Sequence, residues 1–383
     1  MPALKNYASH ESSSKGRRFA ETPANNRGEF QRDRDRIVHS AAFRRLEYKT
    51  QVFVNHEGDM FRTRMTHTIE VAQIARSIAR SLQVNEDLTE AIALSHDLGH
   101  TPFGHAGQDS LNTCMANFGG FEHNLQALRI VDDLEEKYAE FDGLNLCFET
   151  REGIIKHCSQ ENALALAELG QRFLDNRQPG IEAQITNLGD EIAYLNHDVD
   201  DGLRSGLLNI EQMREVELFQ TQYEIVTSAY PQLPDRRTIH EVVRRMVNAQ
   251  VTDLIDSSIE NINTIKPSCR EDILNLEHPI IRYSDDMLAK KRQLKTFLRH
   301  QLYKHYRVHR MSRKGRQIVA ALFHCFFDDY QLLPSETQLK VKSLQQSQGE
   351  TGFARAIADY IAGMTDRYAI SEYQRLFSAK SLT

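Results

Sequence analysis

The stretch from Arg64 to His123 reads RMTHTIEVAQIARSIARSLQVNEDLTEAIALSHDLGHTPFGHAGQDSLNTCMANFGGFEH. It contains five of the chain's 16 histidines, and Asp97 follows His96 directly. Imidazole and carboxylate groups at this density, on segments with helical spacing, are typical of a metal site with acid–base chemistry. We therefore expect the fold to be organised around this stretch.

Helices are expected on both sides of the string HDLGH. Apolar residues recur at helical spacing over residues 66–82, and a second helix is expected over residues 86–98. Residues 99–104 read GHTPFG. Because glycine and proline end helices, His100 and His105 are expected on a loop, a common place for catalytic groups. Three further helical segments are expected, over residues 30–46, 121–130 and 152–174.

A later segment, residues 185–206, reads ITNLGDEIAYLNHDVDDGLRSG. Its apolar residues form one helical stripe, which consists of Leu188, Ile192, Leu195 and Val199. Asp190, Tyr194 and Asp198 follow one another at i, i+4 and i+8 on the opposite face. One face can therefore meet the core while the other carries two carboxylates and a phenol in a row, although a solvent-facing helix can show the same pattern.

Composition limits the classes of function. The chain has 383 residues, 40% hydrophobic and 26% charged, with a net charge of −6, so an anionic ligand needs a local positive cluster or a metal. No apolar run approaches the length of about 20 residues that a membrane helix needs. We expect no signal peptide, because the N-terminal residues contain no apolar segment, and the five cysteines are scattered without a CxxC motif. We expect a cytoplasmic protein with reduced thiols, without a membrane partner.

The remaining sequence also favours helices. Beyond residue 210 the apolar spacing stays helical, prolines separate the segments, and alternating strand patterns are scarce. The predicted fold is all-α.

Four residues are predicted to form a metal site: His67, His96, Asp97 and Asp190. Mixed imidazole and carboxylate ligands suit a divalent ion, Mg²⁺ or Mn²⁺ first, with Co²⁺, Fe²⁺ or Ni²⁺ as alternatives. They argue against a closed structural zinc site, which favours thiolates. Taken singly, each of these residues is more often a hydrogen-bonding core residue or a cap; the ordered set on helices favours the metal.

These residues carry a family resemblance. The pattern H…HD…D resembles the HD-domain phosphohydrolases, which are helical proteins. Four longer strings resemble the deoxynucleoside triphosphate triphosphohydrolase branch, the dGTPase-like proteins. They are RDRDRIVHSAAFRRLEYKTQVF (residues 32–53), HDLGHTPFGHAG (96–107), GGFEHN (119–124) and GDEIAYLNHDVDD (189–201).

The resemblance implies hydrolysis of a deoxynucleoside triphosphate, dGTP or dNTPs generally, to a deoxynucleoside and inorganic triphosphate. Water attacks the α-phosphorus and the sugar 5′-oxygen leaves. His105 would be the acid–base group, and His123 would support the same phosphate. The substrate contacts would come from Arg45 and Arg64 at the phosphates, Gln51 and Asp198 at the 3′-hydroxyl, and Tyr194 against the sugar. The resemblance also suggests a homo-oligomer.

The chain departs from the family pattern at Gln108, which matters most, and at Glu191 beside Asp190. The dGTPase-like proteins usually carry an acidic residue three positions after the equivalent of His105, where this chain has Gln108. An amide oxygen can accept a hydrogen bond from the imidazole but adds no charge. We therefore expect a lower histidine pKa than in acidic relatives, with weaker or differently regulated turnover.

The predicted organisation has four regions: 1–30, a polar, mobile tail; 31–61, a helix that contacts substrate and packs on the core; 62–205, the HD metal-binding core; and 206–383, a helical C-terminal extension. Two alternatives to the triphosphohydrolase stay open. One is another HD nucleotide phosphohydrolase. The other is a catalytically weak regulator that binds nucleotides or single-stranded nucleic acid through the basic residues 289–316.

Overall fold

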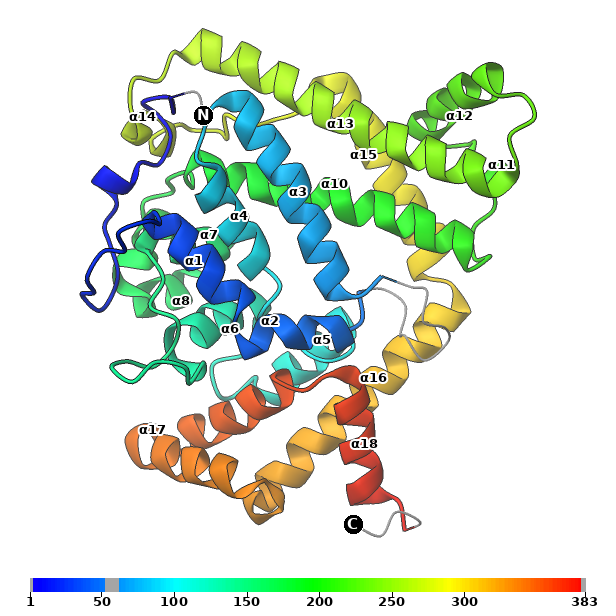
Figure 1. Cartoon of the computed structure of the whole chain (residues 1–383). Helices are drawn as coiled ribbons and strands as arrows, with labels where there is room; N and C mark the ends of the chain where they lie inside the picture. The colour runs from blue at the N-terminus through cyan, green and yellow to red at the C-terminus, as the bar shows by residue number, and fades with distance from the viewer. Residues whose placement is uncertain (1–2, 52–61, 380–383) are drawn as a thin grey trace. The chain divides into compact units, whose positions relative to one another are not determined.

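The computed structural model describes residues 3–51 and 62–379 (Figure 1). Within these ranges every regular element is a helix, and the only strand-like pairings are two isolated bridges, Arg17 with Cys147 and Thr50 with Thr63. The predicted all-α fold is confirmed. Of the predicted substrate-contacting segment 31–61, residues 52–61 lie outside the described residues. No helix in the described ranges has the length and hydropathy of a membrane span.

The chain divides into two compact units. The first consists of Met1–Ile37, His67–Leu94 and Asn145–His305. Its helices, some of which extend past these limits, are α1 (Glu29–Val38), α3 (Arg64–Leu82), α4 (Glu86–Ser95), α7 (Phe148–Ile154), α8 (Gln160–Ala165), α9 (Gln171–Leu174), α10 (Ile181–Arg204), α11 (Ile210–Met213), α12 (Glu217–Ala229), α13 (Asp235–Ile265), α14 (Arg270–Leu274) and α15 (Asp285–Leu298).

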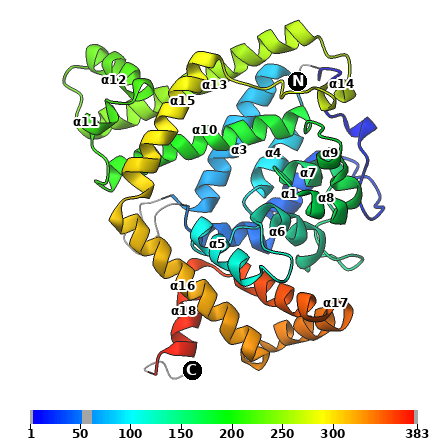
Figure 2. The ribbon, with the colours of Figure 1, turned by 180° about the vertical axis from the view of Figure 1, so that it is seen from behind.

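Helix α10 is the central element of the first unit and packs against α7, α13 and α15 (Figure 2). Ile192, Leu195 and Val199 of its predicted apolar stripe are fully buried, and Leu188 is half-buried. This burial removes apolar surface from water and fixes the rotation of α10 about its own axis. The opposite row, Asp190 to Asp198, is thereby held in a defined direction.

The second unit consists of Val38–Thr66, Ser95–Leu144 and Tyr306–Thr383. Its helices are α2 (Ala41–Arg45), α5 (Gly104–Cys114), α6 (His123–Arg129), α16 (Tyr306–Asp328), α17 (Ser335–Ala362, kinked at Gly349) and α18 (Asp366–Phe377). Helix α16 packs against α5, α17 and α18 around a cluster of buried aromatic and aliphatic side chains (Figure 1). Gly315 of α16 faces Phe103, where an added Cβ would lie 2.7 Å from the Phe103 Cβ, so any larger residue would push α16 away from α5.

Several predicted boundaries were wrong. Helix α4 ends at Ser95, so His96 and Asp97 lie in the turn that follows it. His100 lies on the predicted loop, but His105 lies in the first turn of α5, because the backbone re-enters a helix at Gly104. The segment 30–46 is broken at Ser40, whose hydroxyl accepts from the Phe43 N–H and caps α2. The segment 152–174 consists of short pieces in place of one helix.

The N-terminal residues make contacts that the sequence did not reveal. The backbone N–H and the hydroxyl of Ser9 both donate to the Glu182 carboxylate at 2.9 Å. The Arg17 guanidinium is buried and donates to the Asp33 carboxylate at 2.5 Å and to the Asn145 carbonyl at 2.6 Å. The residues that form these polar bonds follow no hydrophobic periodicity, so their contacts cannot be predicted from the spacing of apolar residues. The predicted mobility of this segment stays a prediction.

Candidate active site

His67 and Asp190 meet in the first unit. His67 is buried in the first turn of α3, and its Nε2 lies 3.0 Å from Oδ1 of Asp190 on α10. Two ligand atoms that share one ion at bond lengths of about 2.1 Å lie about 3 Å apart when they are adjacent. The pair therefore has the separation and the donor types of a divalent-ion site.

A second histidine orients the His67 ring. His197 Nδ1 lies 3.4 Å from His67 Nδ1, and His197 Nε2 lies 2.6 Å from the Glu70 carboxylate. A ligating imidazole commonly has its other ring nitrogen fixed by such a partner. Sequence reasoning missed His197; its signal was its place seven residues after Asp190, two helical turns along the same face of α10.

Lys156 is a further residue that sequence reasoning missed. Its ammonium forms an ion pair with Oδ2 of Asp190, so the carboxylate lies between a lysine and His67. Lys156 follows α7 and is 34 positions from Asp190. No periodic pattern connects residues across that distance, and only the fold brings them together.

His96 and Asp97 lie in the second unit, where Asp97 is surrounded by cationic and imidazole groups. Arg64, itself fully buried, donates from Nη1 to Asp97 Oδ2 at 2.9 Å. Asp97 Oδ1 lies 3.3 Å from His96 Nε2 and 3.1 Å from His100 Nε2. Burial alone would raise the pKa of Asp97, but His96, Arg64 and His100 hold it well below its usual range. The carboxylate is therefore ionised in the folded protein.

Three histidines form a cluster beside Asp97. The rings of His100 and His123 stack with centroids 4.2 Å apart, and His105 lies 5.5 Å from His100 and 6.4 Å from His123. Burial lowers the pKa of His105, and the charges of Arg64 and His123 lower it further, although part of the residue is exposed to solvent. His105 is therefore mostly neutral at pH 7 and able to accept a proton. Glu122 Oε1 lies 3.0 Å from His123 Nδ1.

Two amide side chains near this cluster have buried, unused acceptors. The side-chain oxygens of Gln51 and Gln108 have no hydrogen-bond partner among the residues that the structure describes. Buried polar atoms are normally paired, so an unpaired acceptor suggests a missing ligand or water. The Gln51 oxygen can accept a hydrogen bond from a sugar hydroxyl. The predicted hydrogen bond from His105 to the Gln108 oxygen is not formed in the structure.

Lys49, a buried lysine, forms hydrogen bonds that stabilise the loop between His96 and α5. Lys49 donates from its ammonium to the backbone carbonyls of His100, at 2.5 Å, and Ala362, at 2.8 Å. Burial lowers its pKa to about 7, and Arg45 and Arg64 contribute. Arg45 is exposed at the end of α2. Lys49 was not predicted as a site residue.

Asp366 fastens the same loop from the C-terminal side. Its carboxylate accepts from the backbone N–H of Thr50 at 3.0 Å and of Phe103 at 2.9 Å. Phe103 has a φ of +63°, which costs a residue with a side chain about 1–2 kcal/mol. The loop therefore holds a strained conformation that Asp366 and the α5–α16 packing maintain.

Tyr194 and Asp198 meet a partner that was not predicted. The Tyr303 hydroxyl donates to Asp198 and lies 2.8 Å from the Tyr194 hydroxyl, and the two rings are stacked. Burial raises the pKa of Tyr194 to about 12, with a contribution from Asp198. Burial and Asp198 also raise the pKa of Tyr303, so both phenols stay protonated, with the Tyr303 O–H already donated to Asp198. Tyr303 lies in the basic stretch of the sequence, where its charged neighbours obscured it.

The donor set fits a divalent metal ion. His67, His96 and Asp190 each offer one ligand atom, from imidazole or carboxylate, and the two histidines are buried. The structure brings His67 together with Asp190 in the first unit, and His96 together with Asp97 in the second. No thiolate belongs to either pair, which agrees with an oxygen- and nitrogen-preferring ion.

Comparison with known proteins agrees with this chemistry. Residues 64–205 match the family model described as HD domain, and residues 281–375 match the model described as phosphohydrolase-associated domain. Fold and donor set thus define the class as helical HD-domain phosphohydrolases.

Proteins that are similar over the whole chain identify the family within this class. A protein of Bordetella pertussis is 58% identical over 381 residues, which cover 98% of this chain and 97% of that protein. A protein of Thiobacillus denitrificans is 56% identical over 100% of this chain and 99% of its own length. A protein of Azoarcus sp. strain BH72 is 58% identical over 98% of this chain and 97% of its own length. Each is named deoxyguanosinetriphosphate triphosphohydrolase-like protein. The chain belongs to this family, which confirms the resemblance inferred from its motifs.

Proposed function

We propose that the protein hydrolyses a deoxynucleoside triphosphate, dGTP or dNTPs generally, to a deoxynucleoside and inorganic triphosphate. The row on α10 carries the proposal: Asp190, a cation ligand, is followed one and two turns later by Tyr194 and Asp198, which Tyr303 joins. A group that attracts a cation thus stands beside hydroxyl-binding groups suited to a sugar. The printed name of the relatives supports the same substrate class.

We assign His67 and Asp190, together with His96 and Asp97, to one divalent ion, with Mg²⁺ or Mn²⁺ preferred. Such an ion would neutralise phosphate charge and orient the attacking water. Within the protein, Arg64 keeps Asp97 ionised and His197 keeps the His67 ring in place. Their roles are thus to preorganise ligands before substrate binds.

The histidine cluster supplies the proton transfer. His105, neutral at pH 7, accepts a proton from the water that attacks the α-phosphorus and returns a proton to the departing 5′-oxygen. His123 and the exposed Arg45 bind phosphate oxygens, and Arg64 has further N–H donors beyond the one that it gives to Asp97. Gln108 makes no bond to His105, so the imidazole lacks an acidic partner at this position.

The sugar site determines the preference for deoxyribose. Gln51 accepts from the 3′-hydroxyl through its unused oxygen, and Asp198 accepts from the same group. The Tyr194 ring, stacked on Tyr303, packs against the 2′-carbon and leaves no room for a 2′-hydroxyl. A Tyr194→Ala enzyme is expected to accept ribonucleotides; continued refusal would remove this steric role.

Product analysis tests the proposed function. The protein is incubated with each dNTP and with Mg²⁺, Mn²⁺ or Co²⁺ in ¹⁸O-labelled water, and the products are separated by chromatography. The expected products are deoxynucleoside and inorganic triphosphate, with ¹⁸O only in the triphosphate, because water attacks phosphorus. Release of orthophosphate or pyrophosphate would instead indicate another HD nucleotide phosphohydrolase.

One observation favours the regulatory alternative. Arg310, Arg313 and Lys314 are exposed near the start of α16, and exposed basic side chains on one helix can bind nucleic acid. Binding to single-stranded DNA that weakens steeply with salt, without turnover of any dNTP, would favour a regulator. Homo-oligomer formation and a cytoplasmic location stay predictions.

A further inference from the structure

Two turns of the second unit lead into the histidines of the proposed site, and both have left-handed backbone. Residues 103–104, with φ of +63° and +57°, come directly before His105. Residues 119–120, with φ of +84° and +68°, lie three residues before His123. The two segments touch, because a Cβ added at Gly99 would lie 2.0 Å from the His123 carbonyl oxygen. Uncommon backbone conformations persist only where neighbouring groups hold them, so the places of both histidines depend on what holds these turns.

Helix α17 holds the turn that leads to His123. Arg355 of α17 donates from Nη2 to the Gly120 carbonyl at 2.7 Å. Asp359, one helical turn further along α17, accepts from Arg129 of α6 at 2.8 Å. Helix α6 begins at His123. Helix α17 is therefore bonded both to the turn before His123 and to the helix that follows it.

Asp366, the first residue of α18, holds the turn that leads to His105. Its Oδ1 accepts from the Phe103 N–H at 2.9 Å, and its Oδ2 accepts from the Thr50 N–H at 3.0 Å. Asp366 is 4% exposed, so water does not compete for these bonds. Thr50 precedes Gln51 in the sequence. One carboxylate thus joins the backbone beside the proposed sugar contact to the backbone beside the proposed acid–base group.

Arg355 and Asp366 come from a different part of the sequence than the turns that they hold. Both lie in residues 281–375, which match the phosphohydrolase-associated model, and both turns lie in residues 64–205, which match the HD domain. We propose that Arg355 and Asp366 are positioning residues of the active site: Arg355 sets the place of His123, and Asp366 that of His105. This assignment rests on the proposed function and gives the C-terminal region a part in it.

A double-mutant cycle tests the role of Arg355. With Mn²⁺ and the dNTP that is hydrolysed fastest, Arg355→Met should lower kcat at least about tenfold, because a reacting group misplaced by about 1 Å can cost about 100-fold. In a His123→Ala background the same substitution should lower kcat less than about twofold, since the group that it positions is gone. An equal loss in both backgrounds would mean that Arg355 does not act through His123 and would overturn the proposal.

A second cycle tests Asp366. Asp366→Asn keeps one acceptor oxygen, so one of the two backbone N–H groups loses its partner. We expect kcat to fall at least about tenfold when His105 is present and less than about twofold in a His105→Ala background. An equal loss in both backgrounds would contradict the role of Asp366. Circular dichroism checks the folding of every variant.

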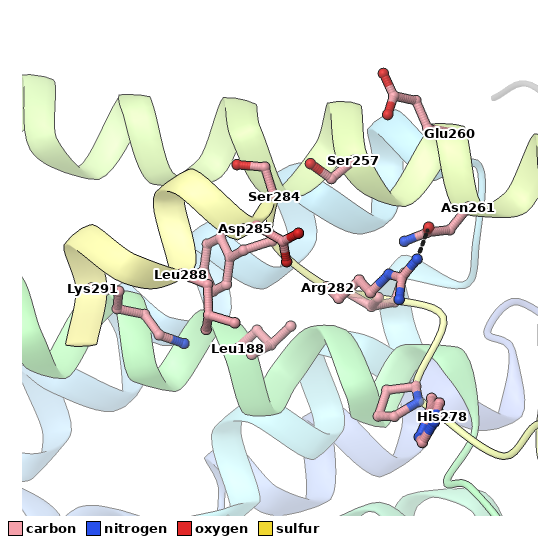
Figure 3. A pocket seen from close by; sticks show the side chains of 13 residues that line it. Leu188, Ser257, Glu260, Asn261, His278, Arg282, Ser284, Asp285, Leu288 and Lys291 are labelled. Atoms are coloured by element: carbon pink, nitrogen blue, oxygen red, sulfur yellow. Dashed lines mark hydrogen bonds between the residues drawn. The ribbon is translucent and has the colours of Figure 1, made fainter.

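Arg282 provides the matched control for Arg355. It lies in the same C-terminal match, lines a pocket of the first unit, and donates from Nη2 to the Asn261 side chain at 2.7 Å (Figure 3). Arg282→Met therefore removes an arginine hydrogen bond of the same length that leads to neither histidine. Its kcat should stay within about twofold of wild type, and a loss as large as that of Arg355→Met would overturn the proposal.

A spectroscopic readout separates this proposal from the proposed function. Imidazole ¹⁵N–¹H spectra of the full chain with ¹⁵N-labelled histidine, in EDTA and without nucleotide, require no turnover. Arg355→Met should shift the ring signals of His123, identified by their loss in His123→Ala, and Arg282→Met should leave them unchanged. Shifted signals without hydrolysis of any dNTP would contradict the proposed function alone. Hydrolysis with unshifted signals in Arg355→Met would contradict the positioning role alone.

Discussion

The two proposed aspartate ligands, Asp97 and Asp190, are held in different ways. The Asp97 side chain is 5% exposed and is bonded to Arg64, which is 2% exposed. The Asp190 side chain is 23% exposed and is paired with Lys156, which is 20% exposed. A buried guanidinium fixes its partner, whereas a lysine on a flexible stem can move aside when a cation arrives. Asp97 is thus held rigidly, whereas the counter-charge of Asp190 can be exchanged.

The largest expected effect comes from Asp97→Asn compared with Asp190→Asn. Loss of Asp97 leaves Arg64 as an unpaired buried charge, which costs about 3 kcal/mol in free energy of unfolding. Loss of Asp190 leaves Lys156 partly exposed to water and should cost less than about 1 kcal/mol. Urea denaturation in EDTA measures both. Equal losses would show that the two carboxylates are held alike.

The pH dependence of stability tests how firmly the second unit's loop is held. Lys49 has a pKa of about 7 in the folded protein, against an ordinary value of 10.5. Between these values the unfolded chain binds one more proton, so stability rises with pH across this window. The stability of wild type relative to Lys49→Met should increase by about 2 kcal/mol from pH 7 to pH 9. A constant difference would mean that Lys49 does not titrate there.

A smaller effect is expected from Lys156→Gln. Removing a cation beside Asp190 removes repulsion toward a metal ion, so Mn²⁺ affinity should rise by about three- to tenfold. Titration with Mn²⁺, followed by electron paramagnetic resonance, measures this affinity. Lys137→Gln, which removes an exposed lysine that donates to the His39 carbonyl, is the matched control. Unchanged affinity in Lys156→Gln would mean that the lysine does not compete with the ion.

The smallest effect is expected from Gln108→Glu. A carboxylate one helical turn from His105 on α5 would favour the protonated imidazole and raise its pKa. The acid limb of the pH–rate profile should move to higher pH, with a rate change at pH 7 of about two- to fivefold. An unchanged profile would remove Gln108 from the catalytic set.

Local patterns predicted the helices well where apolar spacing was regular. The stripe on α10 is an example, because Ile192, Leu195 and Val199 recur at helical intervals and are buried. Short helices after Phe148 were predicted as one, since turns such as Leu166–Ala167 depend on backbone geometry more than on composition. Helix α4 was predicted three residues too long, although His96 and Asp97 were still named.

Partners across long sequence separations could not be predicted. His67 and Asp190 were assigned together from the order of the motifs. Lys156 and Tyr303 belong to no recognised motif, and only tertiary contacts bring them to Asp190 and Asp198. Arg64 was predicted to contact phosphate, and the structure shows its bond to Asp97. Such electrostatic partners depend on three-dimensional distance, which hydrophobic periodicity does not encode.

The central proposal is that His67, His96, Asp97 and Asp190 bind one divalent ion. Equilibrium dialysis against Mn²⁺ tests it most directly, with wild type, His67→Ala and His96→Ala, each checked for folding by circular dichroism. We predict one Mn²⁺ per wild-type chain and a loss of affinity of at least about 100-fold in each variant, one taken from each unit. Two ions per wild-type chain, or wild-type affinity in either variant, would contradict the claim.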